Sequence, residues 1–168
     1  MEKSRQTHPF PPLWNAESRV LILGSFPSVK SREQAFFYGH PQNRFWPVIA
    51  ALFGEAVPRS IAEKTALILS HRLALWDVIG SCEIAGSSDA SITAVRANDL
   101  RPILAGADIR AVFCNGGASW NYYQKLCRPV LGREAGKLPS SSPANARWTL
   151  EKLTETWRAE ILPYLKDA

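Results

Sequence analysis

The sequence predicts an α/β fold, a three-layer α/β/α sandwich around a central, mainly parallel, four-stranded sheet. Short apolar runs that stop at turn residues indicate buried strands, and segments with helical spacing of apolar residues lie between them. Strand and helix alternate along the chain, as they do around parallel sheets. The 168 residues suffice for one core, so we expect a single domain over 1–168, with residues 1–15 as an N-terminal arm.

The first half of the chain supplies two of the four strands. Residues 19–24, RVLILG, form an apolar run that stops at a glycine, and 73–79, LALWDVI, form the second run. A loop rich in Gly, Pro and Ser follows the first strand over 25–42. Helices over 45–53 and 61–71 then fill the interval before the second strand.

The second half continues the alternation. A short helix capped by Asn98 or Asp99 precedes the third strand at 109–114, IRAVFC. Another helix is expected from about Ala118, and a short fourth strand just before Pro139.

The last helix is expected to begin at Ser142, with Pro143 at its first position. Its apolar residues are spaced three, four and four apart, which predicts one buried stripe made of Leu150, Leu153, Trp157 and Ile161.

Composition narrows the class of protein. Hydrophobic residues make up 46% and charged residues 21%, which is ordinary for globular proteins, and no apolar run is long enough to cross a bilayer. No signal peptide is visible, so a cytoplasmic location is expected. The net charge of +5 favours an anionic partner such as nucleic acid.

The metal-binding residue types show no ligand spacing. Cys82, Cys114 and Cys127 are far apart and are expected to be buried, and His8, His40 and His71 are equally scattered. We therefore expect no metal and no cofactor.

Three polar loops leave the carboxyl ends of the predicted strands, where open α/β sheets bind ligands. They are 25–28, the segment after Asp77, and 140–145. The loop GSFPS at 24–28 and the loop LPSSSPAN at 138–145 suit close approach of a ligand or of phosphates, but each is also an ordinary turn.

The segment FFYGHPQNRFW at 36–46 is more informative, because it gathers aromatic and amide side chains in a surface loop. Aromatic faces stack on bases, and amides hydrogen-bond base edges or hold a water. Asn43 also precedes an apolar helix, so the residues alone leave it open between a helix cap and a catalytic group.

Together these loops resemble the uracil-DNA glycosylase superfamily, in its hypoxanthine-DNA (deoxyinosine) glycosylase branch. GSFPS stands at the first glycosylase motif, YGHPQNRFW is close to the loop that follows it, and LPSSSPAN is similar to the second motif. The resemblance implies a monofunctional enzyme that flips a deaminated base out of DNA and hydrolyses its N-glycosidic bond. It further implies DNA as partner, no metal or cofactor, and a monomer.

The resemblance also assigns roles to single residues. Asn43 carries the catalysis, Gly24, Ser25 and Phe26 line the base pocket, and Tyr38 stacks on the base. Asp77, at the end of the second strand, is expected among the base-binding residues and is the nearby acidic candidate for activating water, unless it serves as a cap or pairs within the rim of the sheet. The expected DNA contacts are His40, Asn115, Ser140, Ser141, Ser142, Ala144 and Asn145.

Two departures from the family pattern concern the base that is removed. Phe26 stands where many members have an Asp or Asn that positions water, and Leu138 where uracil-specific members have a histidine. Both changes argue against efficient removal of uracil, and the resemblance to the deoxyinosine branch implies hypoxanthine as the base. The alternatives are a uracil or mixed deaminated-base glycosylase, or a binder of damaged DNA without catalysis.

Overall fold

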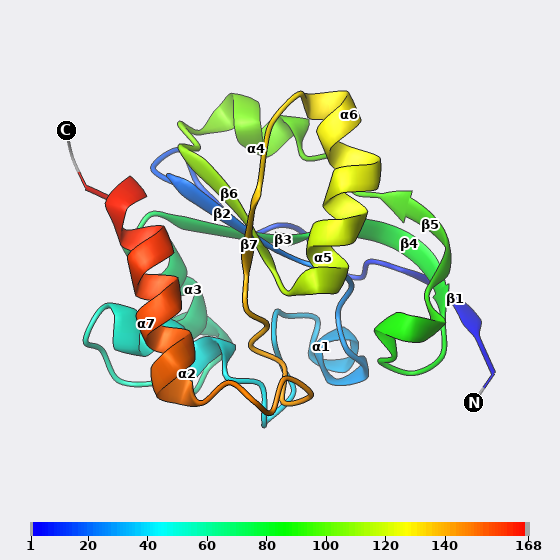
Figure 1. The fold of residues 1–168 in the computed structure, drawn as a ribbon, viewed down its shortest axis with the longest axis horizontal. Helices are drawn as coiled ribbons and strands as arrows, with labels where there is room; N and C mark the ends of the chain where they lie inside the picture. The colour runs from blue at the N-terminus through cyan, green and yellow to red at the C-terminus, as the bar shows by residue number, and fades with distance from the viewer. Residues whose placement is uncertain (1, 167–168) are drawn as a thin grey trace.

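The computed structural model describes residues 2–166, in which a four-stranded parallel sheet has the order β3-β2-β6-β7 (Figure 1). The strands are β2 (Val20–Gly24), β3 (Leu73–Asp77), β6 (Ala111–Asn115) and β7 (Gly136–Leu138). Every residue of β2 and β3 is buried, because helices cover both faces of a parallel sheet. This confirms the predicted sheet.

Two groups of helices form the outer layers (Figure 1). One face carries α2 (Phe45–Leu52), α3 (Ile61–Ser70) and α7 (Leu150–Ile161). The other carries α4 (Arg101–Gly106), α5 (Gly117–Tyr122) and α6 (Arg128–Leu131), and the π-helical turn η2 (Tyr123–Cys127) joins the last two. The 3₁₀ turns are η1 (Asp89–Ser91) and η3 (Leu162–Tyr164).

A second sheet, which the sequence did not predict, lies beside the first. Its antiparallel strands have the order β1-β4-β5 and are β1 (Ser4–Thr7), β4 (Ile79–Ile84) and β5 (Thr93–Ala97). The expected strand 73–79 is therefore two strands, because the chain leaves the parallel sheet after Asp77. Part of the expected arm is strand β1, paired with β4.

The second sheet has its own small apolar cluster. Phe26, Ile79, Cys82, Ile84 and Ile92 form it and are buried. The loop after β2 thus supplies a core residue to the antiparallel sheet.

Two expected helix boundaries are corrected. The loop 25–42 contains a helix, α1 (Val29–Gln34), whose cap Ser28 accepts a hydrogen bond from the Ser31 N–H. The last helix does not begin at Ser142: α7 follows Thr149, whose hydroxyl accepts from the Lys152 N–H at 3.2 Å.

The stripe expected on the last helix is confirmed in part. Leu153, Trp157 and Ile161 are fully buried, but Leu150 is exposed at the start of α7. The cysteines are all free and buried, as expected.

Candidate active site

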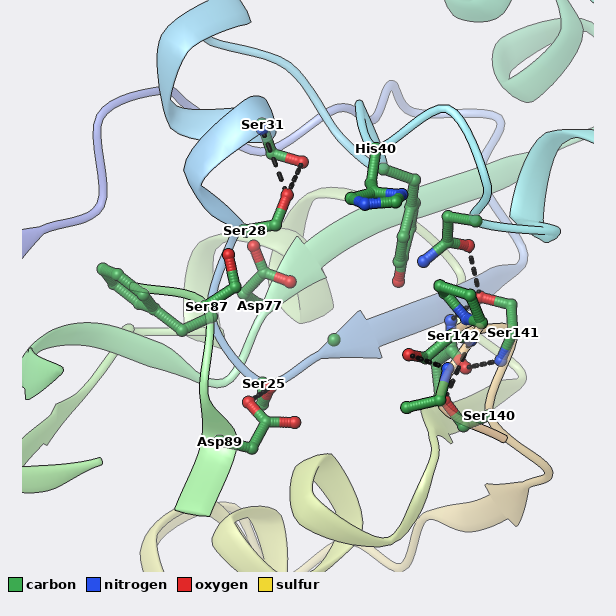
Figure 2. Close-up of a pocket in the computed structure, with 17 residues that line it drawn as sticks. Ser25, Ser28, Ser31, His40, Asp77, Ser87, Asp89, Ser140, Ser141 and Ser142 are labelled. Atoms are coloured by element: carbon green, nitrogen blue, oxygen red, sulfur yellow. Dashed lines mark hydrogen bonds between the residues drawn. The ribbon is translucent and has the colours of Figure 1, made fainter. Parts of the chain in front are cut away.

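A cavity of about 310 Å³ opens at the carboxyl ends of β2, β3 and β6 and beside the loop after β7, where parallel sheets bind ligands. Its size lies at the lower end of the range for small-molecule sites. Figure 2 shows Ser140, Ser141 and Ser142 on one side, across from Asp77 and Asp89. The lining residues are Gly24, Ser25, Phe26, Ser28, Ser31, Tyr38, His40, Asn43, Asp77, Ser87, Asp89, Asn115, Ser140, Ser141, Ser142, Pro143 and Ala144.

Of the residues that the sequence predicts for the site, all but Asn145 line this cavity. Asn145 lines the adjoining surface hollow, which it shares with Ser140 and Asn115. Sequence reasoning missed Ser28, Ser31, Ser87, Asp89 and Pro143.

Asn43 stands just before Arg44, the N-cap residue of α2, and it also lines the cavity. Its Oδ1 accepts hydrogen bonds from the Phe45 N–H at 2.9 Å and from the Ser141 hydroxyl at 2.8 Å. The first bond helps to satisfy the free N–H groups at the start of α2. With Oδ1 engaged twice, the Nδ2 amino group is the part of the amide left for a ligand.

Ser141 links Asn43 to the end of β6. Its side chain is buried, and its hydroxyl accepts from Asn115 Nδ2 at 2.9 Å while it donates to Asn43. The Ser141 N–H donates to Asn115 Oδ1 at 3.0 Å. Both side chains are thus engaged within the protein, which favours a positioning role for them over the phosphate contacts that the sequence predicts.

Arg44 holds the loop that follows β7. Its guanidinium donates to the backbone carbonyls of Ser142 at 2.8 Å and of Asn145 at 3.0 Å, and also to that of Trp148. Its own backbone N–H donates to the Ser141 carbonyl at 3.0 Å. This arginine therefore ties the segment 141–148 to the loop that carries Asn43.

The rim of the cavity is built from short turns within that loop. Ser140 Oγ accepts from the Ser142 N–H, and Ser142 Oγ accepts from the Ala144 N–H. Asn145 Nδ2 donates to the Ser140 carbonyl at 3.0 Å. Ala144 is exposed, so this rim is open to the surface of the protein.

Tyr38 is held in an unusual conformation. Its φ is 51°, a region that costs a non-glycine residue free energy and that is found at functional sites. One ring face stacks on Phe45 at 3.9 Å between centroids. Burial, and secondly the charge of Asp77, raises the pKa of Tyr38 far above its ordinary value, so its hydroxyl stays protonated.

Gly24 must be a glycine because two polar groups converge on it. A Cβ there would lie 2.4 Å from Asp77 Oδ1 and 3.2 Å from the Tyr38 hydroxyl oxygen. The end of β2 thus allows both side chains to approach the floor of the cavity.

Asp77 is buried and pairs with His8, a residue that the sequence placed in no site. His8 Nε2 lies 2.6 Å from Asp77 Oδ2, and the two side chains are only 2% and 6% exposed. The rings of Phe10 and Trp76 pack on His8 at 4.5 and 4.3 Å. No signal in the sequence joins the two, because the pairing of β1 with β4 brings them together.

A second carboxylate lies at the cavity. Ser25 Oγ donates to Asp89 Oδ1 at 2.9 Å (Figure 2). Asp89 is exposed as a residue, but neighbouring protein atoms remove part of the water from its carboxylate. This loss of hydration raises the pKa of Asp89, while the Ser25 bond lowers it.

Phe26 and His40 lie at the edges of the cavity. The Phe26 ring is only 9% exposed and packs in the cluster of the antiparallel sheet. His40 is half-buried, and its Nδ1 accepts from the Gln42 N–H at 3.1 Å.

Within residues 2–166, no group of three or more His, Cys, Asp or Glu side chains could hold a metal ion. In the same part of the chain, no helix has the length and apolar character to cross a membrane.

Known proteins resemble this chain over most of its length. Residues 11–166 match the uracil DNA glycosylase superfamily. A hypoxanthine DNA glycosylase of Methanosarcina acetivorans is 34% identical over 89% of this chain and 94% of its own. The hypoxanthine DNA glycosylase of Methanosarcina barkeri is 33% identical over 82% of this chain and 87% of its own.

A solved structure has the same fold. The solution NMR structure of a protein from Methanosarcina acetivorans, provisionally described as a uracil DNA glycosylase, superposes with a TM-score of 0.78. It is 30% identical, and the match covers 94% of this chain and 97% of that one.

Proposed function

The chain belongs to the uracil DNA glycosylase superfamily, and on that premise we propose that it removes hypoxanthine from DNA by hydrolysis of the N-glycosidic bond. The observation that carries the proposal is the amide of Asn43, fixed by two hydrogen bonds with its Nδ2 left for a ligand in a cavity of about 310 Å³. The relatives named above, identified as hypoxanthine DNA glycosylases, support the choice of base.

In the proposed reaction, deoxyinosine rotates out of the helix into the cavity, at a cost of a few kcal/mol that is smaller for a mispaired base. Tyr38, backed by Phe45, stacks on the base, while Gly24, Ser25 and Phe26 surround it. The rim residues Ser140, Ser142, Ala144 and Asn145, together with His40, contact the DNA backbone.

Bond cleavage breaks the bond between N9 of hypoxanthine and C1′ of the sugar. The oxygen of a water molecule bonds to C1′, one water proton leaves for the base, and an abasic site remains. Negative charge develops on the purine as the bond breaks. A fixed amide donor aimed at that charge is worth about 2.7–4 kcal/mol, by analogy with oxyanion-hole donors.

The bonds of Asn43 limit what it does in this step. It is neutral, so it is no general base, and its Oδ1 is already engaged by Phe45 and Ser141. We therefore assign it as a hydrogen-bond donor to the leaving purine.

We also propose that the enzyme acts as a monomer in the cytoplasm, without a cofactor.

The test compares two variants of Asn43 in single-turnover base release from a duplex with one deoxyinosine. Asn43→Asp keeps the acceptor for Phe45 and Ser141 but loses the donor, whereas Asn43→Ala loses both. We expect both to slow release at least about 100-fold. Asn43→Ala alone should also lower the free energy of unfolding, by about 1 kcal/mol, because the Phe45 N–H and the Ser141 hydroxyl lose their acceptor.

Four outcomes would count against the proposal. Full activity of Asn43→Ala would reject the site, and full activity of Asn43→Asp would reject the donor role. Faster release of uracil or xanthine than of hypoxanthine by the unmodified protein would favour a mixed deaminated-base glycosylase. DNA binding without release of any base would indicate a damaged-DNA binder.

A further inference from the structure

The N-terminal arm contributes a buried histidine to the wall of the cavity. His8 and Asp77 are 69 positions apart in the sequence, and the antiparallel pairing of β1 with β4 aligns them. The His8 N–H also donates to the Gly80 carbonyl at 2.7 Å. The histidine is therefore held by backbone as well as by the rings around it.

The position of the His8 proton follows from its surroundings. Within residues 2–166, Nδ1 of His8 is buried and meets no hydrogen-bond partner, whereas Nε2 lies 2.6 Å from Asp77 Oδ2. A buried N–H without an acceptor is costly. The favoured tautomer carries its proton on Nε2 and donates it to an ionised Asp77.

In the described part of the chain, Oδ2 is the oxygen of Asp77 that is engaged in this way. The other, Oδ1, lies over Gly24 at the floor of the cavity, and Figure 2 shows the carboxylate pointing into that space. An ionised carboxylate accepts hydrogen bonds and donates none. Oδ1 is therefore placed to accept an N–H from a ligand that displaces water from the cavity.

Deamination creates such an N–H. Adenine has a lone pair at N1, whereas hypoxanthine has N1–H next to a carbonyl; cytosine and uracil differ in the same way at N3. We propose that Asp77 Oδ1 recognises a deaminated base by accepting this ring N–H, and that His8 is the positioning residue that orients Asp77. The inference rests on the proposed function and adds the chemical feature by which the damaged base is told from the normal one.

Adenine fails this contact for a physical reason. Its N1 lone pair would face the carboxylate, and sites built to receive a donor reject ligands that lack it by large factors. Its N6 amino group would reach Oδ1 only if the ring moved, which would displace the glycosidic bond from Asn43; a shift of about 1 Å costs roughly 100-fold in rate. Guanine also carries N1–H, so other groups must exclude it.

The test replaces the N–H rather than the whole base. Single-turnover release is measured from duplexes with deoxyinosine or 1-methyldeoxyinosine, in which a methyl group stands in place of the N1 hydrogen. The unmodified protein should release 1-methylhypoxanthine at least 100-fold more slowly. Asp77→Ala, which removes the carboxylate and makes room for the methyl group, should narrow that ratio to less than tenfold.

A second variant keeps the volume of the side chain, in case Asp77→Ala folds poorly. Asp77→Asn presents an amide whose amino group can face N1. Unsubstituted purine has a lone pair at N1. The rate of its release, divided by the rate of hypoxanthine release, should therefore be at least tenfold higher in Asp77→Asn than in the unmodified protein. An unchanged ratio in both variants would overturn the inference and would fit a role for Asp77 in activating water.

The role of His8 has a matched control. His8→Phe keeps a ring between Phe10 and Trp76 but loses the hydrogen-bond donor to Asp77. It should narrow the ratio of the release rates of hypoxanthine and 1-methylhypoxanthine. His8→Gln, which retains an N–H, should restore part of that ratio. His71→Phe removes the histidine of a similar pair with Glu55 outside the cavity and should change neither rate nor ratio. An equal ratio in His8→Phe and the unmodified protein would reject the positioning role.

The results separate the two proposals. If the unmodified protein releases no hypoxanthine, the proposed function fails. If it does release hypoxanthine and the ratios stay constant across the variants of Asp77 and His8, only the recognition of the N–H fails.

Discussion

On one wall of the cavity, amide and hydroxyl groups form hydrogen bonds with one another. On the opposite wall, two carboxylates face the cavity. We call the first, made of Asn43, Asn115 and Ser141, the amide wall. The second, made of Asp77 and Asp89, is the carboxylate wall. The amide wall is neutral, and its members hydrogen-bond to one another, while the Asn43 amino group is left for a ligand.

This difference indicates how a DNA strand would enter. Phosphates are repelled by the carboxylate wall, so the backbone is expected along the serine-rich loop next to the amide wall. The base edge, which carries N–H groups, can face the carboxylates. The neutral wall then lies near the bond that breaks and the charged wall near the base edge that is recognised.

The largest expected effect comes from loosening the amide wall at Arg44. Arg44→Met removes a guanidinium that donates to four carbonyl groups of the segment 141–148. Hydrogen bonds of charged groups contribute about 1.5–3 kcal/mol each and are not additive, so we expect a loss of about 2–4 kcal/mol in the free energy of unfolding. Chemical denaturation measures it.

Arg101→Met is the matched control for this variant. Arg101 pairs with Asp99 on the exposed surface, where such pairs contribute about 0–1 kcal/mol. If both variants lost the same small amount, Arg44 would not be the anchor of the loop.

A smaller effect is expected from Ser141. Ser141→Ala leaves Asn115 Nδ2 and Asn43 Oδ1 each without one partner, and this should cost about 1–3 kcal/mol of stability. Because Asn43 then loses part of its orientation, single-turnover hypoxanthine release should slow about tenfold or more. Ser142→Ala, whose hydroxyl only accepts from the Ala144 N–H, should change release less than threefold. Equal rates in the two variants would show that the link through Ser141 does not position Asn43.

The amide wall was largely predictable from the sequence. Its loops leave strands that are continuous apolar runs, and the position of ligand sites at the carboxyl ends of parallel strands then brings the loops after β2, β6 and β7 together. The capping bond of Asn43 followed from its place before an apolar helix. The hydroxyl of Ser141 between two amides was not predictable, because a serine-rich loop does not indicate which hydroxyl is buried.

The carboxylate wall was predicted only in part, because it depends on the antiparallel sheet. Strand β1 reads SRQT and β5 reads TAVRA, and both are largely exposed, so neither shows the apolar alternation that signals a strand. Without that sheet, His8 has no reason to meet Asp77. Phe26 likewise stood at a position associated with water, whereas its ring belongs to the apolar cluster of the second sheet.

The smallest expected effect is on thermal stability and comes from removing the charge of Asp89. Its dependence on pH distinguishes the carboxylate wall from the neutral amide wall. Loss of hydration raises the pKa of this carboxyl in the folded protein. Between the unfolded and the folded pKa the native state binds more protons, so stability falls as pH rises through this interval, and the cost is complete above the folded pKa.

Asp89→Asn removes the charge, and its side-chain oxygen can still accept a hydrogen bond from the Ser25 hydroxyl. At pH 7 the variant should therefore melt at a higher temperature than the unmodified protein. This gain should vanish below about pH 3, where Asp89 is protonated in both states. Asp108→Asn, at an exposed aspartate outside the cavity, controls for the change in net charge. A gain that persists at low pH, or one that Asp108→Asn reproduces, would mean that Asp89 carries no penalty specific to the carboxylate wall.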